Sequence, residues 1–205
     1  MGSSPIKIAM KKIIINKEEV RNEDLSHLLP FLQWSPTVQY FNTPAGVNEY
    51  RLYSYLAQKV NKPTILDVGT YYGLSSVALS IDESKHVISY DVIELSTHSN
   101  LKKDNIELRI GNFMEDDIDY DNIDLIVIDV DPHDGIQEPP MIQFLVDKGW
   151  EGLLLLDDIK YAAYPGMTEM WNTLPYKKYD VTDIGHHSGT GLLNIGKKFT
   201  IEFVE

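Results

Sequence analysis

Short apolar runs alternate with longer amphipathic stretches along most of the chain. Three of the runs, at 65–66, 125–128 and 153–156, are apolar without alternation, which is typical of parallel strands buried on both faces under helices. Five runs in all predict strands: Thr64–Val68, 87–90, 107–110, 124–128 and Gly152–Leu156. The pattern therefore indicates a mostly parallel sheet covered on both sides.

Helical spacing of apolar positions lies between and before these runs. It predicts helices over 48–60, 74–81 and 139–148, and the last begins with prolines suited to a first helical turn. A helix followed by repeated strand and helix is typical of a Rossmann-like, doubly wound α/β sheet. We expect one domain over residues 40–205, preceded by an N-terminal extension or helical cap at 1–39.

The C-terminal part departs from this alternation. Runs at 178–184 and Gly191–Ile195 resemble strands, but only a short segment rich in Gly, Ser and His separates them. Such a connection cannot hold a crossover helix, so the two strands must pair antiparallel. The predicted fold is thus a seven-stranded, mostly parallel sheet with a C-terminal antiparallel hairpin.

Composition and charge exclude several classes of binding partner. The 205 residues are 43% hydrophobic, and the net charge of −13 disfavours nucleic acid; residues 82–134 alone hold 15 acidic and 4 basic side chains. The absence of cysteine excludes disulfides and thiolate metal sites and suits a cytoplasmic protein. No apolar run approaches the ~20 residues of a membrane span, and the N-terminus lacks a signal-peptide stretch, so we expect no membrane partner.

Two glycines, Gly69 and Gly73, lie in the turn between the first core strand and the next helix. Glycine permits positive φ and lets a ligand approach the backbone. Their spacing is G-x-x-x-G rather than the G-x-G-x-x-G of dinucleotide sites, so a tight phosphate turn is not indicated. Asp91 ends the second strand, where folds of this class hold the ribose hydroxyls of an adenosine ligand. The alternatives are a purely structural turn and a solvated strand-end acid.

At these residues the chain resembles the class I S-adenosylmethionine-dependent methyltransferases. Segment 67–73 is similar to their first motif, Asp91 to their second-strand acid and 111–113 to their adenine-side loop; the hairpin matches their reversed last strand. Segment 40–47 resembles the loop that packs on the methionine part of the cofactor in small O-methyltransferases, or is a Pro/Gly turn. The resemblance implies these cofactor-binding residues: Asn42, Val47, Asp67, Gly69, Thr70, Tyr72, Gly73, Ser75, Asp91, Asn112 and Asp129.

Three carboxylates follow two further strands: Asp129 after the fourth, and Asp157 and Asp158 after the fifth. If these strands flank the first, the three converge and repel one another, which a bound divalent cation would relieve. Oxygen ligands favour Mg2+, Ca2+ or Mn2+ over Zn2+. The alternative is that Asp129 and Asp158 cap the following turns or helices.

The acidic pattern resembles the metal-dependent O-methyltransferases of the catechol and caffeoyl-coenzyme-A type, which implies Asp129, Asp157 and Asp158 as metal ligands. Those enzymes commonly place a lysine base three residues after the first ligand, where this chain has Pro132. His133 is the nearest replacement as general base. His186 and His187 lie in the hairpin loop, and at most one of two adjacent side chains is expected to face a pocket.

We therefore expect an enzyme that transfers a methyl group from S-adenosylmethionine to an oxygen of a small hydroxylated acceptor, assisted by a divalent metal. The sequence leaves open whether the protein forms a homodimer. The alternative is a catalytically silent cofactor-binding or interaction protein with the same fold. An NAD-dependent oxidoreductase fits Gly69 and Asp91 but fails on the glycine spacing and the hairpin.

Overall fold

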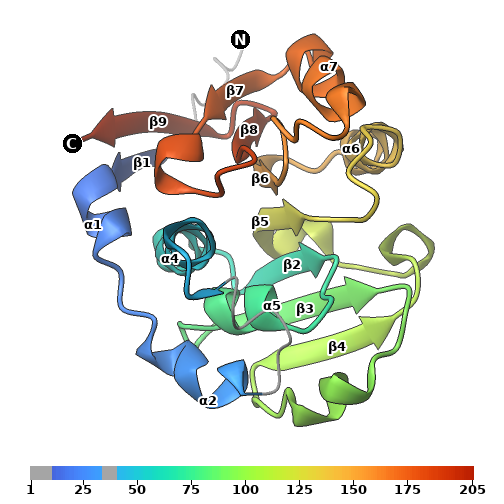
Figure 1. The fold of residues 1–205 in the computed structure, drawn as a ribbon. Coiled ribbons are helices and arrows are strands. Elements are labelled where there is room, and N and C mark those ends of the chain that lie inside the picture. Colours follow the sequence, from blue (N-terminus) through green and yellow to red (C-terminus); the bar gives the residue numbers. More distant parts are fainter. Residues whose placement is uncertain (1–10, 34–40) are drawn as a thin grey trace, which may run out of the picture.

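A computed structural model describes residues 11–33 and 41–205, and a seven-stranded sheet forms its centre (Figure 1). The strand order is β4-β3-β2-β5-β6-β8-β7; β2 to β6 run parallel, and β8 is antiparallel to both β6 and β7. The strands are β2 Thr64–Val68, β3 His86–Asp91, β4 Ile106–Ile110, β5 Ile123–Ile128, β6 Gly152–Leu156, β7 Lys177–Asp180 and β8 Gly191–Ile195. The predicted sheet and its reversed last strand are confirmed.

Side chains of the central strands alternate between two separate cores. In β5, Leu125 and Val127 pack on one face of the sheet, and Ile126 and Ile128 on the other. The first face is covered by α4 (Pro44–Lys59) and α5 (Leu74–Leu79), the second by α6 (Glu138–Asp147) and α7 (Pro165–Thr173) (Figure 1). Burial on both faces explains why the strand sequences show no polar alternation.

The two ends of the described chain meet in a second, two-stranded sheet. Strand β1 (Lys11–Asn16) pairs in parallel with β9 (Phe199–Val204), and Ile13 and Ile15 enter the core that α4 lines. Helix α1 (Lys17–Arg21), a 3-10 turn at Ser26–Leu28 and α2 (Leu29–Leu32) follow. The described residues of the expected N-terminal extension thus share one hydrophobic core with one face of the seven-stranded sheet.

Several boundaries differ from the predicted ones. Helix α4 begins at Pro44, four residues earlier, because the Thr43 hydroxyl accepts a hydrogen bond from the Gly46 amide and caps it. The predicted strand 178–184 ends at Asp180, whose carboxylate accepts the Thr182 amide at 3.1 Å and opens a 3-10 turn at Thr182–Ile184. The remaining 3-10 turns are Ser96–Asn100, Phe113–Glu115 and Tyr120–Asn122.

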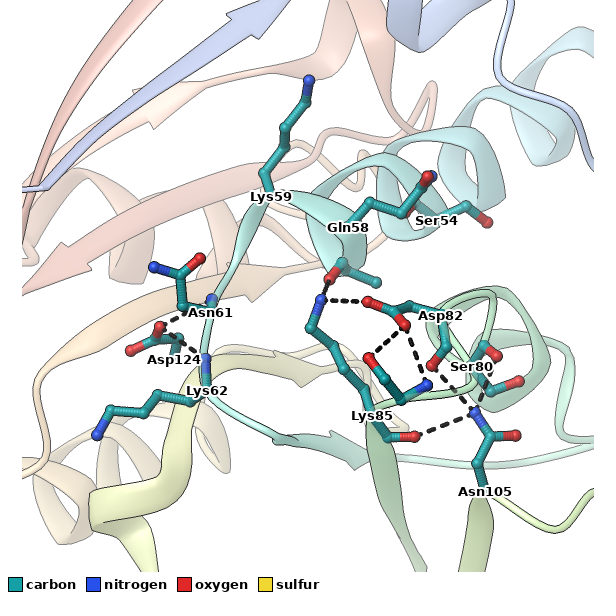
Figure 2. A network of polar contacts seen from close by, with 12 residues as sticks. Ser54, Gln58, Lys59, Asn61, Lys62, Ser80, Asp82, Lys85, Asn105 and Asp124 are labelled. Atoms are coloured by element: carbon teal, nitrogen blue, oxygen red, sulfur yellow. Dashed lines mark hydrogen bonds and ion pairs between the residues drawn. The ribbon is translucent and has the colours of Figure 1, made fainter.

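A polar network closes the edge of the sheet where the parallel strands begin (Figure 2). The buried Lys85 ammonium donates to the Ala57 carbonyl near the end of α4 at 2.7 Å and to Asp82 at 2.8 Å. Asn105 donates to the Ser80 and Lys85 carbonyls. These bonds tie α4, α5 and the starts of β3 and β4 together, and the opposite edge carries the loops described next.

Among the described residues, no helix is long and apolar enough to cross a bilayer.

Candidate active site

The turn after β2 lies directly against the turn after β5. Gly69 has φ +101°, and a β carbon built there would lie 1.6 Å from the Asp129 carbonyl oxygen. Gly73, at φ +86°, would place a β carbon 2.1 Å from the Leu101 side chain. Any larger residue would displace the neighbouring segment, so both positions require glycine.

Asp67 lies beneath this glycine turn rather than in an open cavity. Its Oδ2 accepts hydrogen bonds from the Ser75, Ser76 and Ser89 hydroxyls at 2.7–2.9 Å, and its side chain is buried. Burial raises the pKa of Asp67, and the three hydroxyl donors act in the opposite direction. Asp67 thereby ties the start of α5 to β2 and β3.

A cavity of about 470 Å³ opens at the ends of β2, β3 and β5. Asp91 lines it and accepts the backbone amides of Tyr71 at 2.7 Å and Ile93 at 2.9 Å. Asn112 also lines it, with its Oδ1 bound to the Met114 amide. The volume is in the range of small-molecule sites. Its lining combines these polar groups with apolar side chains, among them Val92, Ile93, Phe113 and Met141.

A second cavity of about 200 Å³ adjoins the first, because Gly69, Tyr71, Asp129 and His133 line both. The predicted cofactor residues in its lining are Gly69, Thr70, Tyr72, Ser75 and Asp129. Asn42 is exposed and Val47 packs against the core, and neither is among the described residues that line the two cavities.

His133 stands where the cavities meet, with carboxylates around its ring. Its Nδ1 lies 3.4 Å from Asp158 Oδ2 and 3.7 Å from Asp129 Oδ1, and its Nε2 lies 3.1 Å from Asp131 Oδ1. The residue has φ +56°, a left-handed conformation that turns the loop after β5 back on itself. Burial raises the pKa of Asp129 to about 7, an effect that nearby His133 opposes.

A second group of titratable side chains lies deeper in the smaller cavity. Glu49, Asp157 and His186 are buried, and one ligand atom from each lies within 4.8 Å of the others, close enough to hold a metal ion. Burial raises the pKa of Glu49 to about 8 and that of Asp157 well above its ordinary value, and lowers the pKa of His186 to about 4. As expected for adjacent residues, His186 lines the cavity and His187 is exposed.

The three predicted metal ligands differ in their histidine neighbours: Asp157 lies beside His186, Asp129 beside His133, and Asp158 beside both. Asp157 belongs to the group with Glu49 and His186, with its Oδ2 3.3 Å from His186 Nδ1. Asp129 and Asp158 face His133. Asp158 Oδ1 also accepts the Ser188 hydroxyl and lies 3.3 Å from His186 Nδ1. All three line the smaller cavity.

Glu49 is the site residue that sequence reasoning missed. It lies one helical turn before Tyr53 and two turns before Leu56, on the buried stripe of α4, and the Tyr53 hydroxyl donates to Glu49 Oε1 at 2.9 Å. An acidic residue in phase with an apolar stripe was the signal available, because buried carboxylates are rare without a partner.

Comparison with known proteins supports the fold. No protein-family model matches the sequence, and no curated protein is detectably similar to it in sequence. Among solved structures, the Podospora anserina methyltransferase PaMTH1, bound to S-adenosylhomocysteine, is similar with a TM-score of 0.63 and 13% identity, over 87% of this chain and 92% of that one.

Two bacterial structures show the same likeness. The O-methyltransferase TomG of Streptomyces achromogenes, in complex with S-adenosylmethionine, has a TM-score of 0.58 and 16% identity over 88% of this chain and 97% of that one. The Bacillus cereus O-methyltransferase, in complex with S-adenosylhomocysteine, has a TM-score of 0.57 and 14% identity over 84% of this chain and 91% of that one. The chain therefore has the fold of S-adenosylmethionine-dependent O-methyltransferases.

Proposed function

We propose that this protein is a methyltransferase that moves the methyl group of S-adenosylmethionine to a hydroxyl oxygen of a small acceptor. The observation that carries the proposal is the pair of adjoining cavities at the ends of the parallel strands. One contains a strand-end carboxylate and apolar walls, the other is acidic, and Gly69 and Asp129 line both. Open α/β sheets bind their ligands at this edge.

The residues present fit an adenosine-type ligand in the larger cavity. Each Asp91 oxygen accepts one backbone amide and keeps lone-pair capacity for a ribose hydroxyl. Val92 and Ile93 are exposed at the same cavity and offer an apolar surface to an adenine ring. Gly69 gives the backbone access that a side chain would block. Thr70, Tyr72 and Ser75 then lie on the side of the smaller cavity, beside the methionine part.

When bound, S-adenosylmethionine supplies an activated methyl group, and the protein's task is to align an acceptor oxygen with it and remove the hydroxyl proton. Alignment in ideal intramolecular models is worth about 7–11 kcal/mol. His133 lines both cavities, so its imidazole is placed to accept the acceptor's proton. Asp129 and Asp158 orient the ring through its Nδ1 side. A divalent cation in the acidic cavity would lower the pKa of the acceptor hydroxyl.

The role of His133 is tested by methyl transfer from labelled S-adenosylmethionine to a panel of small hydroxylated acceptors. His133→Gln should lower kcat by about 10²–10⁴-fold, the usual contribution of a general base. Binding of S-adenosylhomocysteine should change little, because the ring does not supply the ribose contact. His27→Gln, far along the sequence in the Ser26–Leu28 turn, is the matched histidine control. Equal kcat in both variants would remove His133 as the base.

A further inference from the structure

We propose that Glu49, Asp157 and His186 bind one first-row transition-metal dication, such as Mn2+, Fe2+ or Zn2+, in preference to Mg2+ or Ca2+. The inference deepens the proposed function and rests on it for the role of the cation beside the acceptor. It shares Asp157 with the all-carboxylate ligand set that the sequence resemblance implies, but it replaces Asp129 and Asp158 with Glu49 and His186, and the imidazole changes the preferred class of metal.

The three side chains come from separate parts of the chain and meet in one place. Glu49 belongs to α4, Asp157 follows β6, and His186 lies in the loop that precedes β8. Each is nine-tenths or more buried, with exposed fractions of 5%, 5% and 7%. One ligand atom from each lies within 4.8 Å of the other two, so small side-chain rotations would bring all three onto a single ion, whose bonds to oxygen and nitrogen are about 2.0–2.2 Å long.

Asp157 supplies a second, independent observation. Its Oδ1 is buried and has no hydrogen-bond partner among the described residues, although its carboxylate lines the smaller cavity. An unsatisfied buried carboxylate oxygen is destabilising unless a cation or a proton compensates it. Glu49 stands across the cluster, so two acids share this space with one imidazole. A dication would neutralise both carboxylates at once.

The other two residues of the all-carboxylate set have additional partners. Asp158 Oδ1 accepts the Ser188 hydroxyl and lies 3.3 Å from His186 Nδ1, and its Oδ2 faces His133 Nδ1 at 3.4 Å. Asp129 Oδ1 faces the same nitrogen at 3.7 Å. Asp129 therefore lies beside the proposed base, whereas Asp158 lies between His133 and His186. Asp158 thus connects the proposed cation ligands to the proposed base within one cavity.

The imidazole determines the metal class. An imidazole nitrogen favours first-row transition metals such as Zn2+ and Fe2+ over Mg2+ and Ca2+, and Mn2+, which carboxylates also suit, is the weakest binder of that series. Two further contacts hold the ligands in place, as outer-shell partners of metal sites commonly do. The Tyr53 hydroxyl donates to Glu49, and Ser188 links His186 Nδ1 to Asp158.

Mn2+ binding to the purified full chain tests the proposal without any need for activity. Free Mn2+ is followed by electron paramagnetic resonance, and pulsed measurements report nitrogen-14 coupling from a bound imidazole. We expect one Mn2+ per chain with that coupling, and displacement by Mg2+ only at about tenfold or greater excess. His186→Gln should abolish the coupling, and Glu49→Gln should weaken binding at least about tenfold.

The controls are His187→Gln, the exposed neighbour, and Asp129→Asn, from the all-carboxylate set; both should keep the coupling and stay within about threefold of the wild-type affinity. Nitrogen coupling that persists in His186→Gln, or Mn2+ binding that is lost in Asp129→Asn but kept in Glu49→Gln, would overturn the proposal. S-adenosylhomocysteine titrated into the same samples reports folding. If the chain binds S-adenosylhomocysteine but no Mn2+, the metal site alone is rejected. If it binds Mn2+ but no S-adenosylhomocysteine, the proposed function alone is rejected.

Discussion

Gly69 links the residue chemistry to the shape of both cavities. Its backbone lies against the Asp129 carbonyl so closely that the turn after β2 and the turn after β5 form one continuous wall. The G-x-x-x-G spacing predicted a turn that a ligand can approach. It could not show that the nearest neighbour is another strand-end loop, because that contact joins positions 60 residues apart.

Gly69→Ala should destabilise the protein by about 2–5 kcal/mol, from backbone strain together with the clash against the Asp129 carbonyl. Gly149 is the matched control. It has φ +75° at the end of α6, and a β carbon added there would meet no atom of the described residues within 4 Å, so Gly149→Ala should cost only about 1–2 kcal/mol. Urea unfolding measures both. Equal losses would show that the close approach of the two turns is not energetically important.

At the scale of elements, the segment after β3 that contains Leu95, His98 and Leu101 packs against the glycine turn after β2. His98 is buried, and its Nε2 lies 2.6 Å from the Tyr71 carbonyl while its Nδ1 accepts the Leu95 amide at 3.2 Å. A carbonyl can only accept, so Nε2 carries the proton. Leu101, in the same segment, packs over Gly73. The segment after β3 therefore orders the turn that contains Tyr71 and Tyr72.

His98→Ala should weaken S-adenosylhomocysteine binding by about 2- to 10-fold, the value of one lost hydrogen bond that orders the turn. Calorimetry gives the affinity directly. His86→Ala removes a half-exposed histidine that pairs with Glu107 at the opposite end of β3, and should leave the affinity unchanged. If both variants bind S-adenosylhomocysteine with the same affinity, the His98 hydrogen bond does not order the glycine turn.

The network at the strand starts stabilises the fold away from the site (Figure 2). Lys85→Met should lower the free energy of unfolding by about 1–3 kcal/mol, because the Ala57 carbonyl and Asp82 lose their buried donor. Lys102→Met, at an exposed lysine, is the control and should be near neutral.

The same pair predicts a pH dependence. The hydrogen bond from Lys85 lowers the pKa of Asp82 to about 2, below its ordinary 3.8. The Asp82 contribution is therefore present above about pH 4 and lost as the pH falls toward 2. The difference in unfolding free energy between wild type and Lys85→Met should shrink over that window. A difference that stays constant from pH 7 to pH 3 would contradict this assignment.

The central elements were predictable because their burial is recorded in the sequence. The unbroken apolar runs of β5 and β6 require helices on both faces, and the short connection before β8 requires antiparallel pairing. Strands β1 and β9 were missed because the partner of each lies at the other end of the chain. Helix α7 was not predicted, although Met167, Met170 and Trp171 form its buried stripe.

At the scale of the whole molecule, the site is an acidic edge with two adjoining cavities. The positions of Asp91, Asp129, Asp157 and Asp158 after predicted parallel strands indicated that they lie at one edge of the sheet, and they line the two adjoining cavities there. The strand order could not predict how the carboxylates are arranged around His133 and His186, since that depends on side-chain directions in three loops. Glu49 enters from α4, which the strand order alone does not place over the site.

The central claim is that the larger cavity binds the adenosine part of S-adenosylmethionine through Asp91. Calorimetric titration with S-adenosylhomocysteine tests it most directly, with NAD titrated in parallel. We predict saturable binding of one S-adenosylhomocysteine per chain and none of NAD. Asp91→Ala should weaken it by about 10- to 100-fold, as expected for hydrogen bonds to a charged group, and Glu94→Ala, outside the cavity lining, should not. Failure of the wild type to bind, or equal affinity in Asp91→Ala, would contradict the account.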